Sequence, residues 1–308
     1  METTKSKTKV LILCSLFTCL CIIGSAQDYY GGGGNGSQRR QPSNNNQPKD
    51  KDNTPEEPSG YISINFGFAT PEGNFSQSYS ENSFSNGSAV GIGYGNYAQP
   101  GSAFHFSLGI PVDHSNFGVA LMFGSYSNQY DINSYANSLN ASPINYNAYS
   151  NSPIIAYQSG GGQNTYDESS IMGGLFATYP IGRLSLDGRL MLGALLCNLP
   201  EQYITAEDAD GDYLQYDVEA SNSTSLAFDV GVGARFLIAQ LGRRKLCVMV
   251  NADYLYSNVS YSTQQDLYVT PSSGSNAGYL VQLVPSPQMS GKLPISLLNI
   301  TFGIGYQL

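Results

Sequence analysis

The last twelve residues of the chain restrict its fold more than any other stretch. From Leu297 to Leu308 one set of alternating residues is apolar and the other is small or polar. Alternation with a period of two indicates a β-strand with two different faces. A chain that ends within a strand needs a partner for that strand's backbone, and a closed barrel supplies one from its first strand. The pattern therefore favours the closing strand of a membrane β-barrel.

The first 26 residues are typical of a secretory signal peptide. Three lysines precede an apolar run of 14 residues (10–23), and small residues lead up to Ala26. We expect cleavage after Ala26. The apolar run is too short to form a helix that spans a membrane.

Composition narrows the class of protein further. The full chain has 14 basic and 23 acidic residues; without the three lysines and one glutamate of the signal peptide, 11 and 22 remain, a net charge of −11. Such an acidic chain is not expected to bind nucleic acid. Charged residues make up only 12% of the sequence and tryptophan is absent, which together with many short alternating runs predicts an all-β protein.

Residues 27–60 predict a disordered low-complexity linker. They contain four consecutive glycines, three consecutive asparagines and a segment rich in Pro, Lys, Asp and Glu. A segment with so few apolar residues cannot offset the entropy lost on ordering. We therefore place the folded domain at residues 61–308.

Eight alternating runs predict an eight-stranded antiparallel up-and-down transmembrane β-barrel with long extracellular loops. The predicted strands are about 61–69, 102–111, 116–127, 169–179, 184–197, 223–238, 246–260 and 295–308. Long gaps of about 32, 41, 25 and 34 residues alternate with short ones of about 4, 4 and 7, the arrangement of outer-membrane barrels. Residues 90–95 also alternate and are assigned to the first long loop. Ten strands would result if they and a segment within 261–294 joined the barrel.

The polar face of these strands predicts a closed interior. With the apolar residues facing lipid, His105 and Asn251 point inward together with a set of charged residues: Asp187, Arg189, Asp229, Arg235 and Asp253. An eight-stranded barrel is just wide enough for side chains to fill it, so these residues are expected to form a polar network that plugs the lumen. A secreted soluble barrel of the lipocalin type would show similar alternation and stays open as an alternative.

Several short motifs resemble the small outer-membrane β-barrel domains related to the membrane part of outer membrane protein A, in the version common in the Bacteroidetes. They are Pro71-Glu72-Gly73-Asn74-Phe75, Asn116-Phe117-Gly118-Val119, Tyr179-Pro180 before Leu184-Ser185-Leu186-Asp187-Gly188-Arg189, and Gly303-Ile304-Gly305-Tyr306. The resemblance spans about residues 61–308. It implies insertion into outer-membrane lipid by the barrel-assembly machinery, which reads the last strand. The family usually ends in Phe or Trp, whereas this chain ends in Leu308.

One acidic loop is a candidate metal site. Asp208, Asp210 and Asp212 are spaced by two residues and Glu219 occupies the twelfth place, which resembles a calcium loop of the EF-hand type. The sixth place, a glycine in that motif, is Tyr213 here, so a solvated acidic loop is the competing interpretation. No other cofactor is predicted.

The sequence also bears on three further functions: enzymatic activity, surface interaction and the passage of solutes. His105 and His114 are the only histidines, and no serine and carboxylate pattern accompanies them, so an enzyme is not expected. The second long loop (128–168) is rich in Tyr, Asn, Ser and Gly, a composition suited to polar contacts with aromatic anchors. We expect a structural or surface-interaction role through the extracellular loops, with an extracellular ligand or a neighbouring surface protein as partner. A conduit for small or apolar solutes is the alternative.

Overall fold

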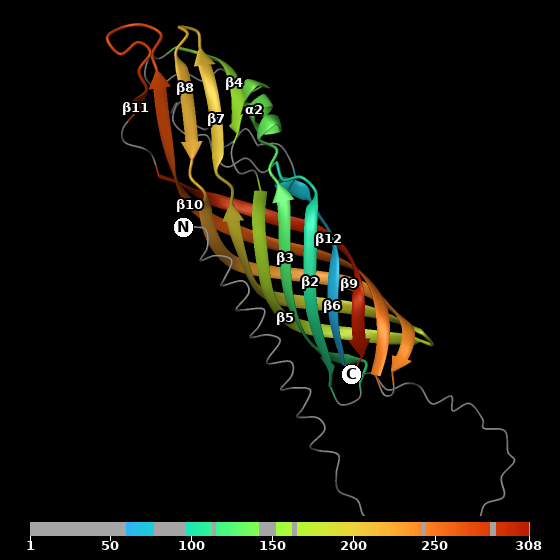
Figure 1. Ribbon diagram of the computed structural model, residues 1–308. Helices are drawn as coiled ribbons and strands as arrows, with labels where there is room; N and C mark the ends of the chain where they lie inside the picture. The colour runs from blue at the N-terminus through green and yellow to red at the C-terminus, as the bar shows by residue number, and fades with distance from the viewer. Residues whose placement is uncertain are drawn as a thin grey trace, which may run out of the picture. The chain divides into compact units, whose positions relative to one another are not determined.

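The computed structural model describes residues 60–76, 97–112, 115–141, 152–161, 165–241, 244–283 and 288–307. All of them belong to the compact unit Pro55–Leu308. The signal peptide and all but the last residue of the linker lie outside the described residues, so both stay predictions. The described part contains twelve strands, one α-helix and one short 3-10 helix (Figure 1).

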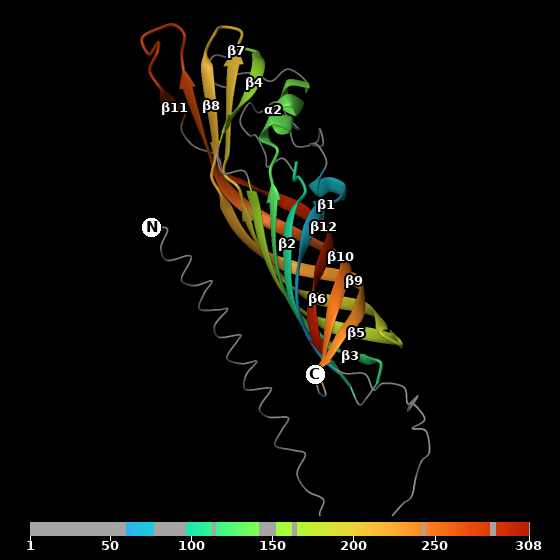
Figure 2. The same cartoon turned by 45° about the vertical axis from the view of Figure 1, so that its right-hand side comes forward.

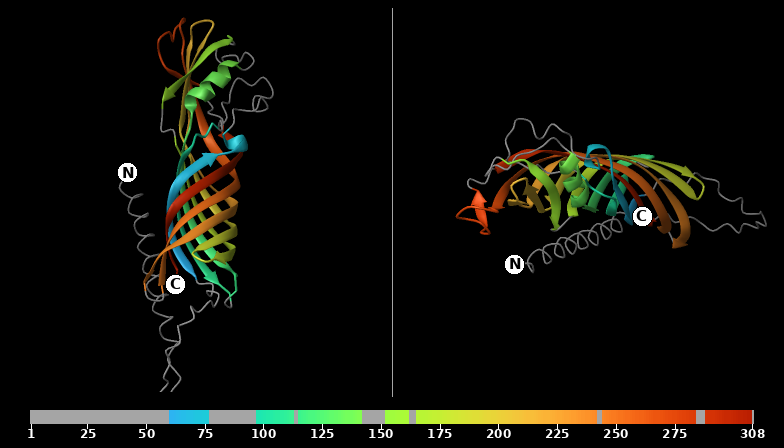
Figure 3. Two further views of the ribbon diagram at one scale, coloured as in Figure 1. Left: turned by 90° about the vertical axis from the view of Figure 1, so that its right-hand side faces the viewer. Right: turned by 90° about the horizontal axis from the view of Figure 1, so that it is seen from above.

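Eight of the strands pair antiparallel in a closed ring. In ring order they are β1 (Tyr61–Pro71), β2 (Gly101–Pro111), β3 (Phe117–Gln129), β5 (Thr165–Ile181), β6 (Leu184–Leu199), β9 (Ser221–Leu241), β10 (Arg244–Thr270) and β12 (Gln288–Gln307). The residue pairs can be followed from strand to strand around the whole ring. Starting at Ser225 of β9, this path comes back to β9 at Arg235, ten residues further along the chain. This stagger requires the strands to tilt around the ring axis, as Figure 3 shows.

The predicted pairing of the last strand with the first is present. β12 pairs with β1 from Gln307 opposite Tyr61 to Leu297 opposite Pro71. Its other edge pairs with β10 over twenty residue pairs. Both edges of the terminal strand are therefore hydrogen-bonded, which is how the ring avoids an open edge.

Several ring strands extend well beyond their predicted ends. β10 continues to Thr270 instead of about residue 260, and β12 begins at Gln288 instead of about residue 295. The two strands pair with each other throughout this extension, up to Gln264 opposite Gln288. Polar residues such as Ser260 and Ser262 interrupt the apolar alternation there, so the pattern that marked the strands ends before the strands do.

Part of the connections predicted as loops forms a second sheet. β4 (Ile154–Gly161), β7 (Gln202–Asp208), β8 (Tyr213–Val218) and β11 (Val281–Leu283) join residues 265–270 of β10 in the order β4–β7–β8–β10–β11. The loop prediction was wrong here. Residues 202–218 form a hairpin whose turn contains Gly211 at a φ of 80°, a conformation that suits glycine. Because β11 joins this sheet, the described part of 261–294 adds no further strand to the ring.

The second sheet lies beyond the end of the ring at which β1 ends and β2 begins (Figures 1 and 2). The buried face of helix α2 (Ile132–Ala141) packs against β4 (Figure 2). The apolar residues of α2 recur at helical spacing and are buried: Ile132, Tyr135, Ala136 and Leu139. The short helix η2 (Gly73–Phe75) follows β1 and buries Phe75 at the same end of the ring.

The ring carries large apolar side chains on its outside. They include Ile64, Phe66 and Phe68 of β1, Phe117, Val119 and Leu121 of β3, Leu186, Leu190 and Leu192 of β6, Phe228, Val230 and Val232 of β9, and Ile300, Phe302 and Ile304 of β12. Each lies between 41 and 68% exposed. The alternate residues on the same strands are buried, and many of them are polar or charged. The ring is thus apolar outside and polar inside, the reverse of a soluble domain.

Candidate functional site

Two ion pairs occupy the interior of the ring. Arg189 of β6 donates from Nη2 to Oδ1 of Asp253 on β10 at 2.6 Å, and both side chains are buried. Gly231 of β9 is the direct strand partner of both residues. The absence of a side chain at Gly231 lets the two groups meet across the middle strand, because a Cβ there would lie 1.8 Å from Asp253 Oδ1.

The second pair lies between neighbouring strands and is bidentate. Arg235 of β9 donates from Nε and Nη2 to the two carboxylate oxygens of Asp187 on β6, at 2.6 and 2.7 Å. Thr178 also hydrogen-bonds both partners, and the Arg235 guanidinium lies 4.6 Å from the centre of the Tyr61 ring. This fork-to-fork geometry is the strong form of an arginine–carboxylate contact, and the aromatic face adds cation–π attraction.

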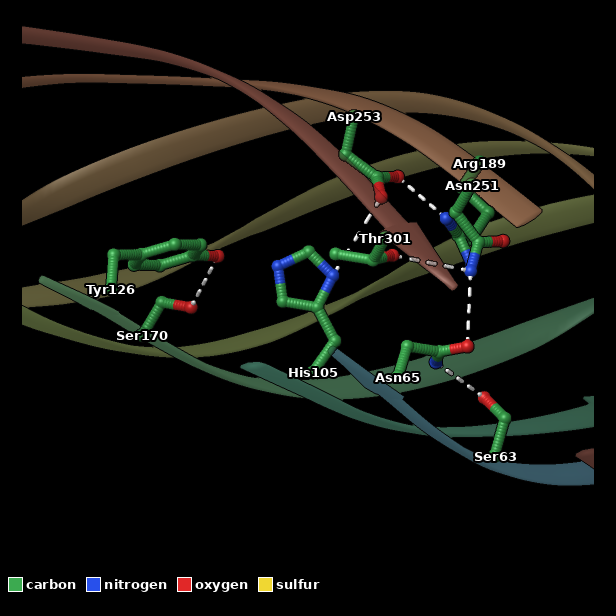
Figure 4. Close-up of polar contacts among 9 residues, drawn as sticks. All are labelled: Ser63, Asn65, His105, Tyr126, Ser170, Arg189, Asn251, Asp253 and Thr301. Atoms are coloured by element: carbon green, nitrogen blue, oxygen red, sulfur yellow. Dashed lines mark hydrogen bonds and ion pairs between the residues drawn. The ribbon is translucent and has the colours of Figure 1, made fainter. Parts of the chain in front are cut away.

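The fifth predicted residue, Asp229, takes no part in these pairs. It is fully buried, and within the described structure neither of its carboxylate oxygens has a hydrogen-bond partner. His105 lies inside the ring as expected, with Nδ1 at 3.7 Å from Asp253 Oδ2 (Figure 4). His114 lies outside the described residues. The structure thus brings four of the five predicted interior residues together as two separate pairs.

Further polar residues complete the interior, and of these only Asn251 was singled out from the sequence. Asn251 donates to Asn65 Oδ1 at 3.3 Å, and Asn65 donates to Ser63 Oγ at 3.1 Å (Figure 4). Tyr126 and Ser170 share a hydrogen bond on the other side of His105. The signal for them was available, since each stands at an inward position of its strand. Uncharged residues did not stand out because asparagine and serine are common everywhere in this sequence.

Large side chains fill the remainder of the ring. Those less than 2% exposed include Tyr61, Met122, Met172, Met191 and Leu195. Near the second sheet, Phe75 contacts Tyr166 with ring centres 5.1 Å apart, so η2 closes that end with an aromatic residue. This packing is what a ring of eight strands is expected to permit.

The acidic loop uses its carboxylates for hydrogen bonds within the protein. Asp208 Oδ1 accepts from the backbone N–H groups of Asp210 and Asp212, at 3.0 and 2.9 Å. Asp212 Oδ1 accepts from the backbone N–H and the hydroxyl of Ser272, which anchors the turn after β10. Glu219 lies exposed beyond β8. In the described ranges no group of three or more His, Cys, Asp or Glu is arranged to hold a metal ion, and calcium binding stays a prediction.

The described tyrosines of the second long loop are buried rather than exposed at the surface. Tyr130, Tyr135, Tyr157 and Tyr166 are at most 7% exposed, whereas Tyr146 and Tyr149 lie outside the described residues. Tyr135 belongs to α2 and Tyr157 to β4, so both help to form the core between the helix and the second sheet. For these four tyrosines the expected role as exposed aromatic anchors was wrong, because the described parts of the loop fold into packed elements.

The second sheet has one face that holds the buried core next to α2. Its opposite face is not covered by any of the described residues. Tyr203 of β7, Asp217 of β8 and Asp266 of β10 are direct neighbours in one row across the strands. Tyr268, Tyr213 and Glu207 follow in the next two rows on the same face. All six are half-buried or exposed. We call these six residues the tyrosine–acid face.

Three of the six residues of the tyrosine–acid face are acidic and none is basic. Burial raises the pKa of the Asp217 carboxyl, and the Asp266 carboxylate opposite raises it further. The pKa of Tyr203 and that of Tyr268 are raised too, by desolvation and by nearby negative groups that include Asp217. Like charges directly opposite each other destabilise a strand pair, and here Gln282 donates a hydrogen bond to Asp266 Oδ1 at 3.3 Å.

The chain is similar to solved outer membrane proteins but to no family model and no curated protein. No family model matches the sequence, and no curated protein matches it at a significant level. Among solved structures, a major outer membrane protein from Thermus thermophilus is 10% identical with a TM-score of 0.35, covering 81% of this chain and 100% of its own. The outer membrane protein AlkL in DMPC lipid bilayers is 16% identical with a TM-score of 0.32, covering 86% of this chain and 97% of its own. Both TM-scores are low, so neither likeness bears on function.

Within the described residues, no helix has the length and apolar character needed to cross a bilayer.

Proposed function

We propose that the chain is an outer-membrane protein whose ring is an eight-stranded up-and-down transmembrane β-barrel. The observation that carries this proposal is the apolar outside of the ring set against its charged inside. Apolar patches larger than a few hundred Å² are rare on soluble monomers, and this one surrounds the ring. β1 and β2 have 11 residues each, and about 9–11 residues suffice for a tilted strand to cross the hydrocarbon core.

The connections between the ring strands indicate which end of the barrel faces outward from the membrane. β2 and β3, β5 and β6, and β9 and β10 are joined by short turns at one end, whereas the second sheet and α2 belong to the long connections at the other. In outer-membrane barrels the long connections are extracellular. The signal peptide, cleavage after Ala26, insertion by the barrel-assembly machinery and the likeness to the Bacteroidetes type of outer membrane protein A are parts of this proposal.

The interior favours a closed barrel over a conduit. Arg189, Arg235 and their carboxylate partners link β6, β9 and β10 across the inside of the wall, and large side chains fill the space around them. The function is then a structural or surface-interaction role, carried by the extracellular sheet. Planar-bilayer recording on the purified protein should show no steady conductance, and persistent single-channel openings would favour the conduit instead.

A charge placed on the outside of the ring separates the membrane barrel from a soluble one. Leu190→Arg puts a cation among exposed apolar residues of β6, and in a bilayer this costs up to about 2–4 kcal/mol. Ile155→Arg is the matched control, since Ile155 is also apolar and exposed but lies on β4 of the second sheet. We expect only Leu190→Arg to reduce the amount of folded protein in the outer-membrane fraction. Equal effects of the two variants, or wild-type protein in the soluble periplasm, would contradict the membrane assignment.

A further inference from the structure

Two exposed arginines lie at the end of the ring opposite the second sheet. Arg183 stands in the turn between β5 and β6, directly after Gly182 with its φ of 62°. Arg244 is the first residue of β10 and lies beside the end of β12 (Figure 1). The fold therefore places two cations where the ring strands end, next to the apolar outside of the wall.

The charges of the described residues are distributed unevenly along the ring. The acidic residues that are not buried all belong to the end with the second sheet: Glu72, Asp131, Asp167, Glu201, Glu207, Asp210, Asp217, Glu219 and Asp266. Of the described basic residues on the surface, Lys292 lies toward that same end, on the first part of β12. Arg183 and Arg244 thus stand apart from the exposed carboxylates of the described chain.

Strand β9 runs between the two arginines and is apolar on its outside at their level. The backbone N–H of Leu237 donates to the Arg183 carbonyl oxygen at 2.9 Å, which holds the turn against this point of β9. β10 pairs with the other edge of the same segment. The residues on either side of Leu237, Phe236 and Ile238, are 49 and 52% exposed. Two apolar side chains therefore face outward on the strand that separates the arginines.

Tyrosines border this part of the wall on both sides. Tyr179 of β5 is 66% exposed. On β12 the centre of the Tyr306 ring lies 5.7 Å from the Arg244 guanidinium. Tyrosines gather where a membrane protein passes from hydrocarbon to the headgroup region, because one end of the side chain is apolar and the other polar. In a membrane barrel, this level of the wall is thus the expected position of lipid headgroups.

We propose that the outward surface at this level binds an anionic phospholipid. We call its four residues the arginine surface: Arg183, Phe236, Ile238 and Arg244. Guanidinium groups form paired hydrogen bonds with phosphate oxygens, and the acyl chains of the same lipid can lie on the apolar side chains of β9. The inference rests on the proposed function, in which this end of the barrel faces the periplasm and its wall faces the lipid of the periplasmic leaflet.

The test measures lipid binding to the folded protein in detergent by native mass spectrometry. Phosphatidylglycerol, whose headgroup has a net negative charge, is compared with phosphatidylcholine of the same acyl chains, whose headgroup is zwitterionic. We expect phosphatidylglycerol to bind about tenfold more tightly, since each arginine close to an anionic lipid contributes about fivefold at most. Equal affinity for the two lipids would overturn the proposal.

Single substitutions identify the residues responsible. Arg183→Gln and Arg244→Gln should each reduce the preference for phosphatidylglycerol by about three- to fivefold. Lys292→Gln is the matched control, because it also removes one exposed positive charge but lies away from the arginine surface. If Lys292→Gln lowers the preference as much as the arginine variants do, the attraction is one of net charge and the proposed surface is wrong.

Glycerol phosphate separates a lipid from a soluble anion, because it offers a phosphate group without acyl chains. We expect it to leave bound phosphatidylglycerol in place at equal concentration, since it gains nothing from contact with Phe236 and Ile238. Displacement at equal concentration would assign the arginines to a soluble anion and overturn the lipid proposal.

Failure of this inference is distinguishable from failure of the barrel proposal. Heat-dependent mobility on gels reports whether each variant is folded, independently of any added lipid. A folded protein in the outer-membrane fraction without preference for phosphatidylglycerol would overturn the arginine surface alone.

Discussion

Arg189 and Asp253 meet at 2.6 Å although 64 residues and one whole strand separate them. Gly231 on the strand between them makes the contact possible, since any side chain there would collide with Asp253 Oδ1. The pair is buried, so neither charge can turn to water if the other moves. The stability of the ring therefore depends on a residue that itself contributes no side chain.

Gly231→Val should destabilise the protein by about 3–5 kcal/mol, the usual cost of breaking a buried ion pair. Gly188→Ala is the control, because a Cβ at Gly188 would meet no atom within 4 Å. Urea unfolding in detergent micelles, followed by gel mobility, measures both. If Gly231→Val unfolds at the same urea concentration as Gly188→Ala, the interior pair is not needed for stability.

The pair of Arg235 and Asp187 predicts a non-additive double variant. Asp187→Leu alone leaves the Arg235 guanidinium buried without its carboxylate, at a cost of about 3–5 kcal/mol. Asp187→Leu combined with Arg235→Met removes both charges, and most of the loss should be recovered. The same urea titration on the two single variants and the double variant gives the coupling. Additive losses would mean that the two residues do not interact energetically.

The start of α2 predicts a dependence on pH. Asp131 immediately precedes the helix and accepts from the backbone N–H of Ser134 at 2.9 Å. Burial would raise the pKa of Asp131, but the hydrogen bonds from Ser134 and Gln99 outweigh it and lower the pKa. A lowered pKa means that the stabilisation is fully present above the unfolded pKa of about 3.9 and is lost as the pH falls through the folded value.

Asp131→Ala should therefore destabilise α2 by about 1 kcal/mol at pH 7, as the loss of a helix N-cap does. The difference from wild type should shrink at pH values below the folded pKa. Asp131→Asn, which keeps a capping oxygen, is the control and should lose less at pH 7. Hydrogen exchange of the α2 amides measures the effect, and an equally large difference at acid pH would argue against a charge-dependent cap.

The contact of Asp212 with Ser272 predicts a local loosening. The Ser272 hydroxyl has two acceptors within reach, Asp212 Oδ1 at 3.0 Å and the Asp210 carbonyl oxygen at 2.7 Å, and shares its one proton between them. Ser272→Ala removes this shared hydrogen bond and should cost about 0.5–1.5 kcal/mol. Amides of residues 208–213 and 271–278 should then exchange faster, while those of the ring should not change. Ser273→Ala is the neighbouring control, and similar exchange in the two variants would show that the contact contributes little.

The interior was only partly predictable from the chain. Alternation places Asp187, Arg189, Asp229, Arg235 and Asp253 on one face of their strands, and the structure buries all five. The alternation does not indicate which carboxylate pairs with which arginine. Asp187 binds Arg235, Arg189 binds Asp253, and Asp229 binds neither arginine. The reason is that the stagger of the ring decides which inward residues lie at the same height along its axis.

The second sheet could not be predicted from the sequence pattern of any one segment. Residues 213–218 alternate, with Leu214, Tyr216 and Val218 on one face, but residues 202–208 do so poorly, and the acidic and polar content of both segments resembled that of loops. Tyr157 and Tyr216, from separate connections, pack with ring centres 6.4 Å apart. Such a core exists only when distant segments meet, so no single segment reveals it.

The faces of the ring strands and the pairing of the last strand with the first were predictable from the sequence, since both follow from a period of two and from the need to satisfy the backbone of the closing strand. The two ion pairs, the exclusion of Asp229 from them and the tyrosine–acid face emerged only in the folded structure. These depend on which strands become neighbours and at what register. A one-residue change of register would exchange the two faces of a strand, and contacts across the ring depend on the tilt of all eight strands together.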